Sequence, residues 1–186
     1  GWGWNITGLS AITRTGSDWY RDVDPNPDPQ FNGVVGVTFT SADRFALDGQ
    51  RLVLLTGSAY GAAGSTYDTE DASFSLVTAV GSGPDHFTVV TKSGMYMEFG
   101  ATADSRVIGN NTSGVFSWRL NRMRDPNGNY IDYVYDYVDG ENRLRRIDYT
   151  GNATAGILPY NRILFDYEPR PDKNELFIHG LNGPKT

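Results

Sequence analysis

Residues 125–136 read Asp-Pro-Asn-Gly-Asn-Tyr-Ile-Asp-Tyr-Val-Tyr-Asp, which is a turn signal followed directly by an alternating segment. Pro, Asn and Gly favour a reverse turn, because Pro presets φ while Asn and Gly tolerate positive φ. From Ile131 to Tyr137, an apolar or aromatic side chain stands at every second position, with Asp132 and Asp136 between them. A period of two is typical of a half-buried β-strand. The stretch therefore predicts a hairpin turn that leads into a strand.

The same pattern extends over most of the chain. Short runs with strand character occur at residues 34–40, 51–55, 74–80, 86–91, 95–99, 115–120, 143–149 and 163–167. Turn signals that tolerate positive φ include Asp48-Gly49, Ser93-Gly94 and Asp139-Gly140. No window has the spacing of an amphipathic helix, and 22 glycines with nine prolines would interrupt one. We therefore predict an all-β fold built from antiparallel hairpins.

The composition fits one domain without a nucleic-acid or membrane role. The 186 residues with 39% hydrophobic content predict a single all-β segment over residues 1–186. Residues 17–30 are polar and proline-spaced, so we expect an exposed loop there. The net charge of −6 argues against nucleic acid as a partner, and no apolar run is long enough to span a bilayer. The chain lacks cysteine and opens on Gly1 without methionine, which predicts a processed or excised segment without disulfides.

Three long strings rich in aromatic residues and glycine follow one another along the chain, at residues 1–14, 43–55 and 120–133. They resemble the SpvB-type N-terminal region of insecticidal toxin-complex B components. The stretch at 125–136 also resembles the tyrosine-aspartate (YD) repeats of the Rhs family. Further similar strings lie at residues 60–61, 67–74, 87–100, 103–106, 146–152 and 159–161. The resemblance covers nearly the whole chain up to about Asp172, and its specificity comes from the order of the strings.

The resemblance implies a structural and non-catalytic role. In that family the region forms β-sheet wall near the start of a hollow shell, so we expect antiparallel hairpins that make a wall segment of a larger YD/Rhs-like β shell and are incomplete on their own. The implied partners are the remainder of the parent chain or another β-shell component, together with a toxic effector region that the shell encloses or delivers. The family also implies a secreted, extracellular bacterial protein. No cofactor is expected.

The candidate residues have structural roles. Tryptophans of the aromatic strings are candidate packing anchors, glycines of the turn signals are candidate sites of positive φ, and polar residues of the second string are a candidate brace around its hairpin. The anchors are Trp2, Trp4 and Trp118, the turn glycines are Gly49, Gly94, Gly128 and Gly140, and the brace residues are Asp43, Arg44 and Asp48.

Two alternatives come from other functional classes. Exposed tryptophans would stack on sugar rings and make the chain a carbohydrate-binding β module. A glycoside-acting enzyme is the third reading, because it needs only two carboxylates at a suitable separation. The carboxylates considered are Glu70, Asp71, Glu98, Asp104, Asp132 and Asp136.

Other chemistry finds little support in the sequence. The Glu-x-Glu or Gln-x-Glu pair of mono-ADP-ribosyltransferases does not occur, and neither does the Gly-x-Ser-x-Gly elbow of serine hydrolases. Oxygen donors alternate in the polar loop as hard cations prefer, but three prolines stiffen it and the glycine and glutamate of a helical-hand calcium loop are missing. The weak calcium candidates are therefore Asp22, Asp24, Asn26 and Asp28, and a solvated loop is favoured.

Overall fold

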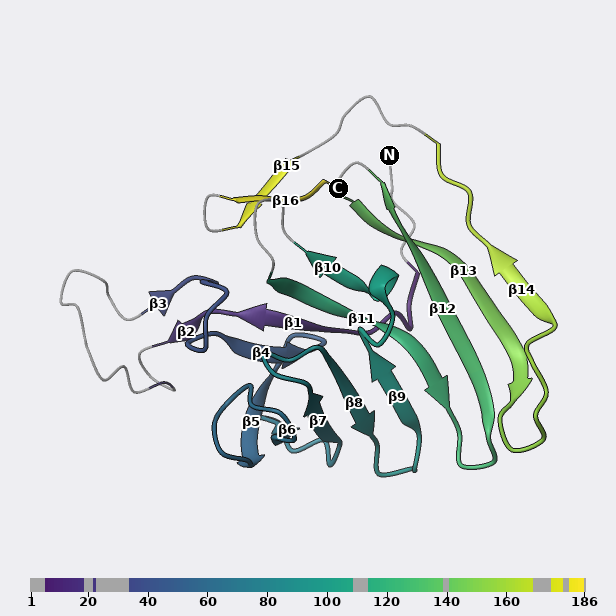
Figure 1. The fold of residues 1–186 in the computed structure, drawn as a ribbon, viewed down its shortest axis with the longest axis horizontal. Helices are drawn as coiled ribbons and strands as arrows, with labels where there is room; N and C mark the ends of the chain where they lie inside the picture. Colours follow the sequence, from purple (N-terminus) through teal and green to yellow (C-terminus); the bar gives the residue numbers. More distant parts are fainter. Residues whose placement is uncertain are drawn as a thin grey trace.

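The computed structural model describes residues 6–18, 22, 34–108, 114–138, 141–168, 175–178 and 181–185. In this part of the chain a twelve-stranded antiparallel sheet dominates, with two small two-stranded sheets beside it (Figure 1). The one helical element of these residues is a 3-10 turn at Ala103–Ser105. Across the described residues, no helix has the length and apolar character needed to cross a membrane. The predicted all-β fold of antiparallel hairpins is confirmed.

Eight strands of the large sheet close into a barrel. The sheet order runs from β1 through β4, β5, β6, β7, β8 and β9 to β11, and β11 pairs with β1 again. Closure gives each of these strands two neighbours, which removes most of the free edges that an open sheet would have. The barrel strands are β1 (Ala11–Thr15), β4 (Arg44–Leu47), β5 (Gln50–Thr56), β6 (Thr66–Thr69), β7 (Leu76–Val80), β8 (His86–Val90), β9 (Tyr96–Phe99) and β11 (Val115–Arg124).

A three-stranded wing extends from the barrel. The wing strands are β12 (Asn129–Val138), β13 (Glu141–Asn152) and β14 (Asn161–Leu164), and β14 is the last in the sheet order. The wing leaves the barrel where the second half of β11 pairs with β12 (Figure 1). The short β10 (Arg106–Ile108) pairs with the first half of β11. The small sheets join β2 (Ser17–Asp18) to β3 (Val34–Val35) and β15 (Glu175–Ile178) to β16 (Leu181–Lys185).

The barrel interior is filled by aromatic and aliphatic side chains. Alternation places every second residue of the short strands inside, so that β7 and β8 each bury two positions and expose or half-expose the others. Phe45 lies at the centre of the aromatic cluster and contacts four rings, and Trp118 packs against it, with its ring centroid 5.0 Å from that of Phe87 and 5.5 Å from that of Phe45. Both contacts are edge-to-face, the arrangement that the ring quadrupoles favour. The core is therefore one continuous cluster that reaches from the barrel into the wing through Tyr133 and Tyr135.

Two predicted strands were wrong in their bounds for the same reason. Within 34–40 only Val34–Val35 is strand, because the backbone turns before β4 and Phe39 has a φ of 59°. Within 74–80 the strand begins at Leu76, because Phe74 has a φ of 58° and is largely exposed. Both phenylalanines carry high strand propensity, but neither lies in extended backbone.

Buried tyrosines predict a loss of stability at alkaline pH. Desolvation by burial raises the pKa of Tyr60 and of Tyr135 well above the usual 10.0, and it raises that of Tyr67 as well. These phenols stay neutral in the folded protein, whereas they ionise in the unfolded chain above about pH 10. The free energy of unfolding is therefore unaffected by them below that pH and falls as the pH rises further. In an alkaline titration followed by tyrosinate absorbance and circular dichroism, we expect the buried tyrosines to ionise at higher pH than the exposed ones, and to do so together with unfolding. Ionisation of every tyrosine near pH 10 in an intact barrel would contradict this prediction.

Candidate functional site

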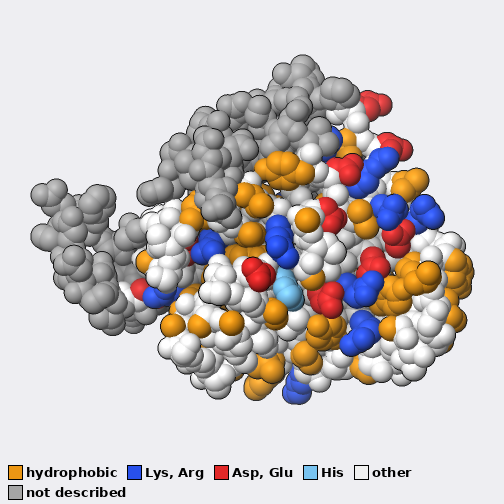
Figure 2. Space-filling model, in the orientation of Figure 1, with side chains coloured by type: hydrophobic (Ala, Val, Ile, Leu, Met, Phe, Trp, Pro, Cys, Tyr) orange, Lys and Arg blue, Asp and Glu red, His pale blue; other side chains and the backbone are white. Residues whose placement is uncertain are grey.

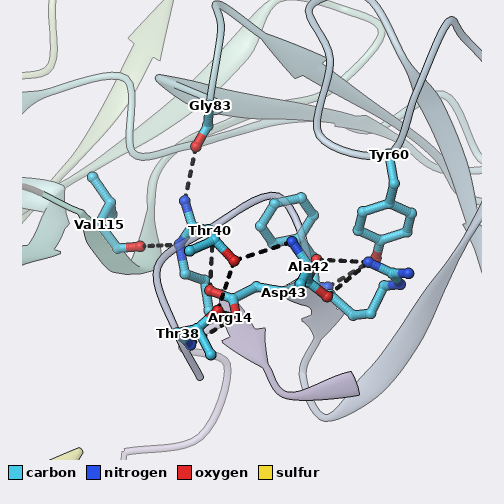
Figure 3. Close-up of polar contacts among 10 residues, drawn as sticks. Arg14, Thr38, Thr40, Ala42, Asp43, Tyr60, Gly83 and Val115 are labelled. Carbon is cyan, nitrogen blue, oxygen red and sulfur yellow. Dashed lines mark hydrogen bonds and ion pairs between the residues drawn. The ribbon is translucent and has the colours of Figure 1, made fainter. Parts of the chain in front are cut away.

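A buried polar cluster lies at one end of the barrel, around Arg14 and Asp43 (Figure 3). Arg14 belongs to β1 and follows Ile12 on the inward face, while Asp43 stands just before β4. The guanidinium Nη1 and the carboxylate Oδ2 are 3.4 Å apart, and both side chains are almost completely buried. The site thus places a buried ion pair on the inward side of the barrel strands.

Hydrogen bonds to backbone complete the surroundings of this pair. Nε of Arg14 donates to the carbonyl of Val115 over 2.7 Å, and Nη2 donates to the carbonyl of Gly83 over 2.8 Å. Oδ1 of Asp43 accepts from both the backbone N–H and the hydroxyl of Thr38. Burial lowers the pKa of Arg14, although the neighbouring carboxylate opposes that shift. The pair therefore joins β1, the segment before β4, the turn between β7 and β8, and the start of β11.

A cavity of about 290 Å³ lies next to the ion pair. Its wall combines the charged pair with aromatic rings and small polar groups of the neighbouring turns. Arg14 also stacks on rings, with its guanidinium carbon 5.4 Å from the ring centroids of Phe45 and Trp118. Because the guanidinium is engaged on several sides by core residues, its contacts fit a role in holding the barrel end together.

The three residues predicted to brace the second hairpin lie on that hairpin but do not form one cluster. Asp43 bonds to Arg14 and Thr38, as described above. Arg44 pairs with Asp22 at 2.7 Å and its guanidinium carbon lies 4.7 Å from the ring centroid of Tyr60. Asp48 accepts hydrogen bonds from the hydroxyl of Ser10 and the N–H of Ala11. These contacts tie the hairpin to three separate neighbours, and the bracing role itself stays a prediction.

The calcium prediction concerns residues that lie mostly outside the described part of the chain. Asp24, Asn26 and Asp28 are outside it, and only Asp22 is described. Its two carboxylate oxygens accept hydrogen bonds from Arg44 and Arg51, so two guanidinium groups occupy the position that a cation would need. The described residues contain no group of three or more His, Cys, Asp or Glu side chains that could hold a metal ion.

The tryptophan and carboxylate candidates of the alternative functions are placed as follows. Trp118 is fully buried and therefore unavailable to stack on a sugar, while Trp2 and Trp4 lie outside the described residues. Asp132 and Asp136 are near Arg122 and Arg145 respectively, at 2.5 and 3.5 Å. Asp104 accepts from the N–H of Tyr135, and Glu98 from the amide of Asn121. These four carboxylates thus make contacts that link strands to one another or to a loop.

The turn glycines adopt positive φ wherever they are described. The values are 83° at Gly49, 81° at Gly94 and 90° at Gly128, whereas Gly140 lies outside the described residues. At the turn between β11 and β12, Asp125 Oδ1 accepts from the N–H groups of Asn127 and Asn129. A hydrogen bond from the Asn129 side chain is the main cause that lowers the pKa of Asp125.

Replacing Gly128 with valine is expected to lower the free energy of unfolding by about 1 kcal/mol or more. Besides its positive φ, a Cβ at Gly128 would lie 2.3 Å from Oγ1 of Thr154, whereas one at Gly156, which also has a positive φ of 67°, would meet nothing within 4 Å. Thermal melting of G128V and G156V separates the clash with Thr154, which only G128V has, from the cost of positive φ, which both variants have. The melting temperature should fall by about 2–4 °C for each kcal/mol of lost stability. An unchanged melting temperature for G128V would show that the turn assignment is wrong.

Arg14 is the residue of this site that sequence reasoning missed. It closes the first aromatic string, and no role was assigned to it. The available signal was its place two residues after Ile12 on an inward strand face, where an arginine requires an acidic partner. That the partner is Asp43 depends on the pairing of β1 with β4 and could not be read from the sequence.

The chain is similar to known proteins in sequence and in fold. The family described as Salmonella virulence plasmid 65kDa B protein (SpvB) matches residues 63–156. The N-terminal domain of effector protein SpvB from Salmonella typhimurium strain LT2 superposes with a TM-score of 0.69 at 18% identity, over 96% of this chain and 72% of that one. TcdB2-TccC3 superposes with a TM-score of 0.61 at 15% identity, over 95% of this chain and 10% of that one. A Photorhabdus luminescens Tc holotoxin pore gives a TM-score of 0.54 at 15% identity, over 77% and 7%. No curated protein sequence matches.

The closed barrel with its wing defines an all-β domain whose fold is shared with these proteins. The family match spans half of the chain, and the chain belongs to the SpvB family. The resemblance predicted from the three aromatic strings is thereby confirmed. The structural likenesses, all below 20% identity, show a shared fold, and the chain spans about a tenth of the TcdB2-TccC3 chain.

Proposed function

We propose that this chain is a non-catalytic structural segment of a secreted bacterial toxin-complex protein, and that it contributes β-sheet wall to a shell that encloses or delivers a toxic region. The likeness to TcdB2-TccC3 over 95% of the chain supports this proposal. The observation that carries it is the wing, because a sheet that leaves a closed barrel and ends at β14 is suited to continue into further strands. The partner is then the remainder of the parent chain or another shell component. The single domain over residues 1–186 belongs to the same proposal, together with an exposed loop at 17–30 from which Ser17–Asp18 are excepted, because they form β2.

The contacts of the candidate residues agree with such a role. The buried ion pair and the aromatic cluster hold the barrel closed, and the arginine and aspartate side chains of the wing join neighbouring strands. A carbohydrate-binding module would need an exposed aromatic platform, and the buried Trp118 does not offer one.

The parent protein tests the proposal directly. Its intact mass and sequence, measured by mass spectrometry from the native source, are expected to include a long continuation rich in Tyr-Asp repeats. The alternative, a carbohydrate-binding module, is tested by measuring whether soluble glycans quench the tryptophan fluorescence of the chain. A natural end near Thr186 together with saturable glycan quenching would overturn the structural proposal in favour of a sugar-binding domain.

A further inference from the structure

The outer edge of β14 is the free end of the described sheet order. All four residues of β14 are exposed, and no other described strand lies beyond it in the sheet (Figure 1). Exposed large apolar side chains surround this edge, and Figure 2 shows hydrophobic side chains gathered at the same margin of the molecule. They are Ile157, Leu158, Tyr160, Ile163, Leu164 and Tyr167. An exposed edge with such a patch is the usual mark of an interaction site.

The backbone of β14 is oriented to accept another strand. The N–H of Phe165 donates to the carbonyl of Arg145 in β13, so residues 161, 163 and 165 direct their backbone groups inward. By alternation, the N–H and C=O groups of Arg162 and Leu164 point away from β13. No other described strand pairs with them.

A row of charged side chains crosses the sheet and ends at this edge. Register places Glu98, Arg122, Asp132, Asp148 and Arg162 side by side on five successive strands. Arg122 therefore has an acidic residue on each flank, Glu98 on one side and Asp132 on the other, and it binds Asp132 with two hydrogen bonds of 2.5 and 2.8 Å. Arg162 has Asp148 on its inner flank, and among the described residues nothing stands on its outer flank.

From this row we infer that the outer edge of β14 binds an extended strand of a partner polypeptide, with an aspartate or glutamate opposite Arg162 and apolar residues opposite Ile163 and Leu164. Cross-strand pairs of opposite charge and of apolar side chains are the units that stabilise such pairing, while the main-chain hydrogen bonds supply most of the affinity. On the inner side, register already places Asp148 of β13 opposite Arg162 and Ile147 opposite Ile163, and the Asp148 carboxylate itself accepts a hydrogen bond from Arg146. The chemistry of the partner strand is therefore a carboxylate set among apolar or aromatic residues. This inference rests on the proposed shell function, but its test uses the isolated chain.

A peptide taken from the chain itself provides the probe. Residues 129–138 read Asn-Tyr-Ile-Asp-Tyr-Val-Tyr-Asp-Tyr-Val and carry carboxylates between aromatic and apolar residues, as the proposal requires. We expect the labelled peptide to bind the 186-residue protein in fluorescence anisotropy, and R162E to weaken binding about tenfold, which is ~1.4 kcal/mol. A peptide with both aspartates changed to lysine should prefer R162E over the unchanged protein. The matched control is R124E, an exposed arginine on β11, which should leave the affinity unchanged.

Two further measurements locate the bound strand. Hydrogen exchange should slow at the amides of Arg162 and Leu164 when the peptide binds. The L164P variant, which removes an outward donor and no bond to β13, should bind weakly while keeping its circular dichroism spectrum. Equal binding by R162E and the unchanged protein, or protection elsewhere on the surface, would overturn the inference. If the protein forms a dimer in sedimentation velocity and L164P abolishes that dimer, the strand bound at β14 belongs to a second copy of this chain and the proposed partner polypeptide is wrong. If the parent protein lacks Tyr-Asp repeats, the proposed shell function is contradicted but strand binding at β14 is not, because the peptide experiment does not depend on the sequence of the parent.

Discussion

Replacing Trp118 with alanine is expected to lower the free energy of unfolding by about 3–5 kcal/mol, the usual cost of removing a large aromatic side chain from a packed core. Trp118 is fully buried, contacts Phe45 and Phe87 edge-to-face, and donates its indole N–H to the carbonyl of Asp85 over 3.1 Å. It also lies on the part of β11 that closes the barrel against β1, opposite Ile12. The variant therefore loses core packing at the point of closure.

Urea unfolding followed by circular dichroism measures this effect without relying on tryptophan fluorescence. The control is L158A, because Leu158 is 78% exposed and its loss should change the free energy of unfolding by less than about 0.5 kcal/mol. W118F retains a ring and should fall between the two, which keeps the experiment informative if the alanine variant does not fold. Equal stability of W118A and L158A would show that Trp118 is not a packing anchor.

Removing Asp43 is expected to cost about 3–5 kcal/mol as well, for an electrostatic reason. D43A leaves the buried Arg14 guanidinium without its carboxylate and leaves two donors of Thr38 without their acceptor. The double variant R14M/D43A also removes the unpaired charge of Arg14, so it should recover part of the free energy of unfolding that D43A loses. An exposed pair provides the control, because D166A, which breaks the contact of Arg145 with the exposed Asp166, should leave the free energy of unfolding almost unchanged. Strict additivity of the R14M and D43A effects would contradict direct coupling between the two side chains.

In the wing, β12 could be predicted accurately from the sequence, whereas the strand predicted at 163–167 lies instead at Asn161–Leu164 and is exposed along its whole length. β12 runs over Asn129–Val138, close to the predicted alternation of 131–137, because its tyrosines keep a strict period of two. β1 was not predicted, since its inward face carries Ile12 and then Arg14, and a charged residue at an inward position breaks the apolar pattern. β6 was missed for a similar reason, because its buried positions are Tyr67 and Thr69.

Closure of the barrel depends on contacts that no local pattern encodes. The pairing of Ala11 with Arg119 joins residues far apart in the sequence, and it decides that the hairpins form a barrel. The same long-range pairing brings Arg14 within reach of Val115. Local patterns predict strands and turns, whereas the partner of each strand follows from tertiary packing.

A cryo-EM map of the intact parent protein tests the central claim most directly. We expect this barrel to lie within the wall of a hollow shell, with the outer edge of β14 paired to a further strand and a carboxylate beside Arg162. A map in which the barrel stands apart from any shell, with β14 facing solvent, would contradict the account.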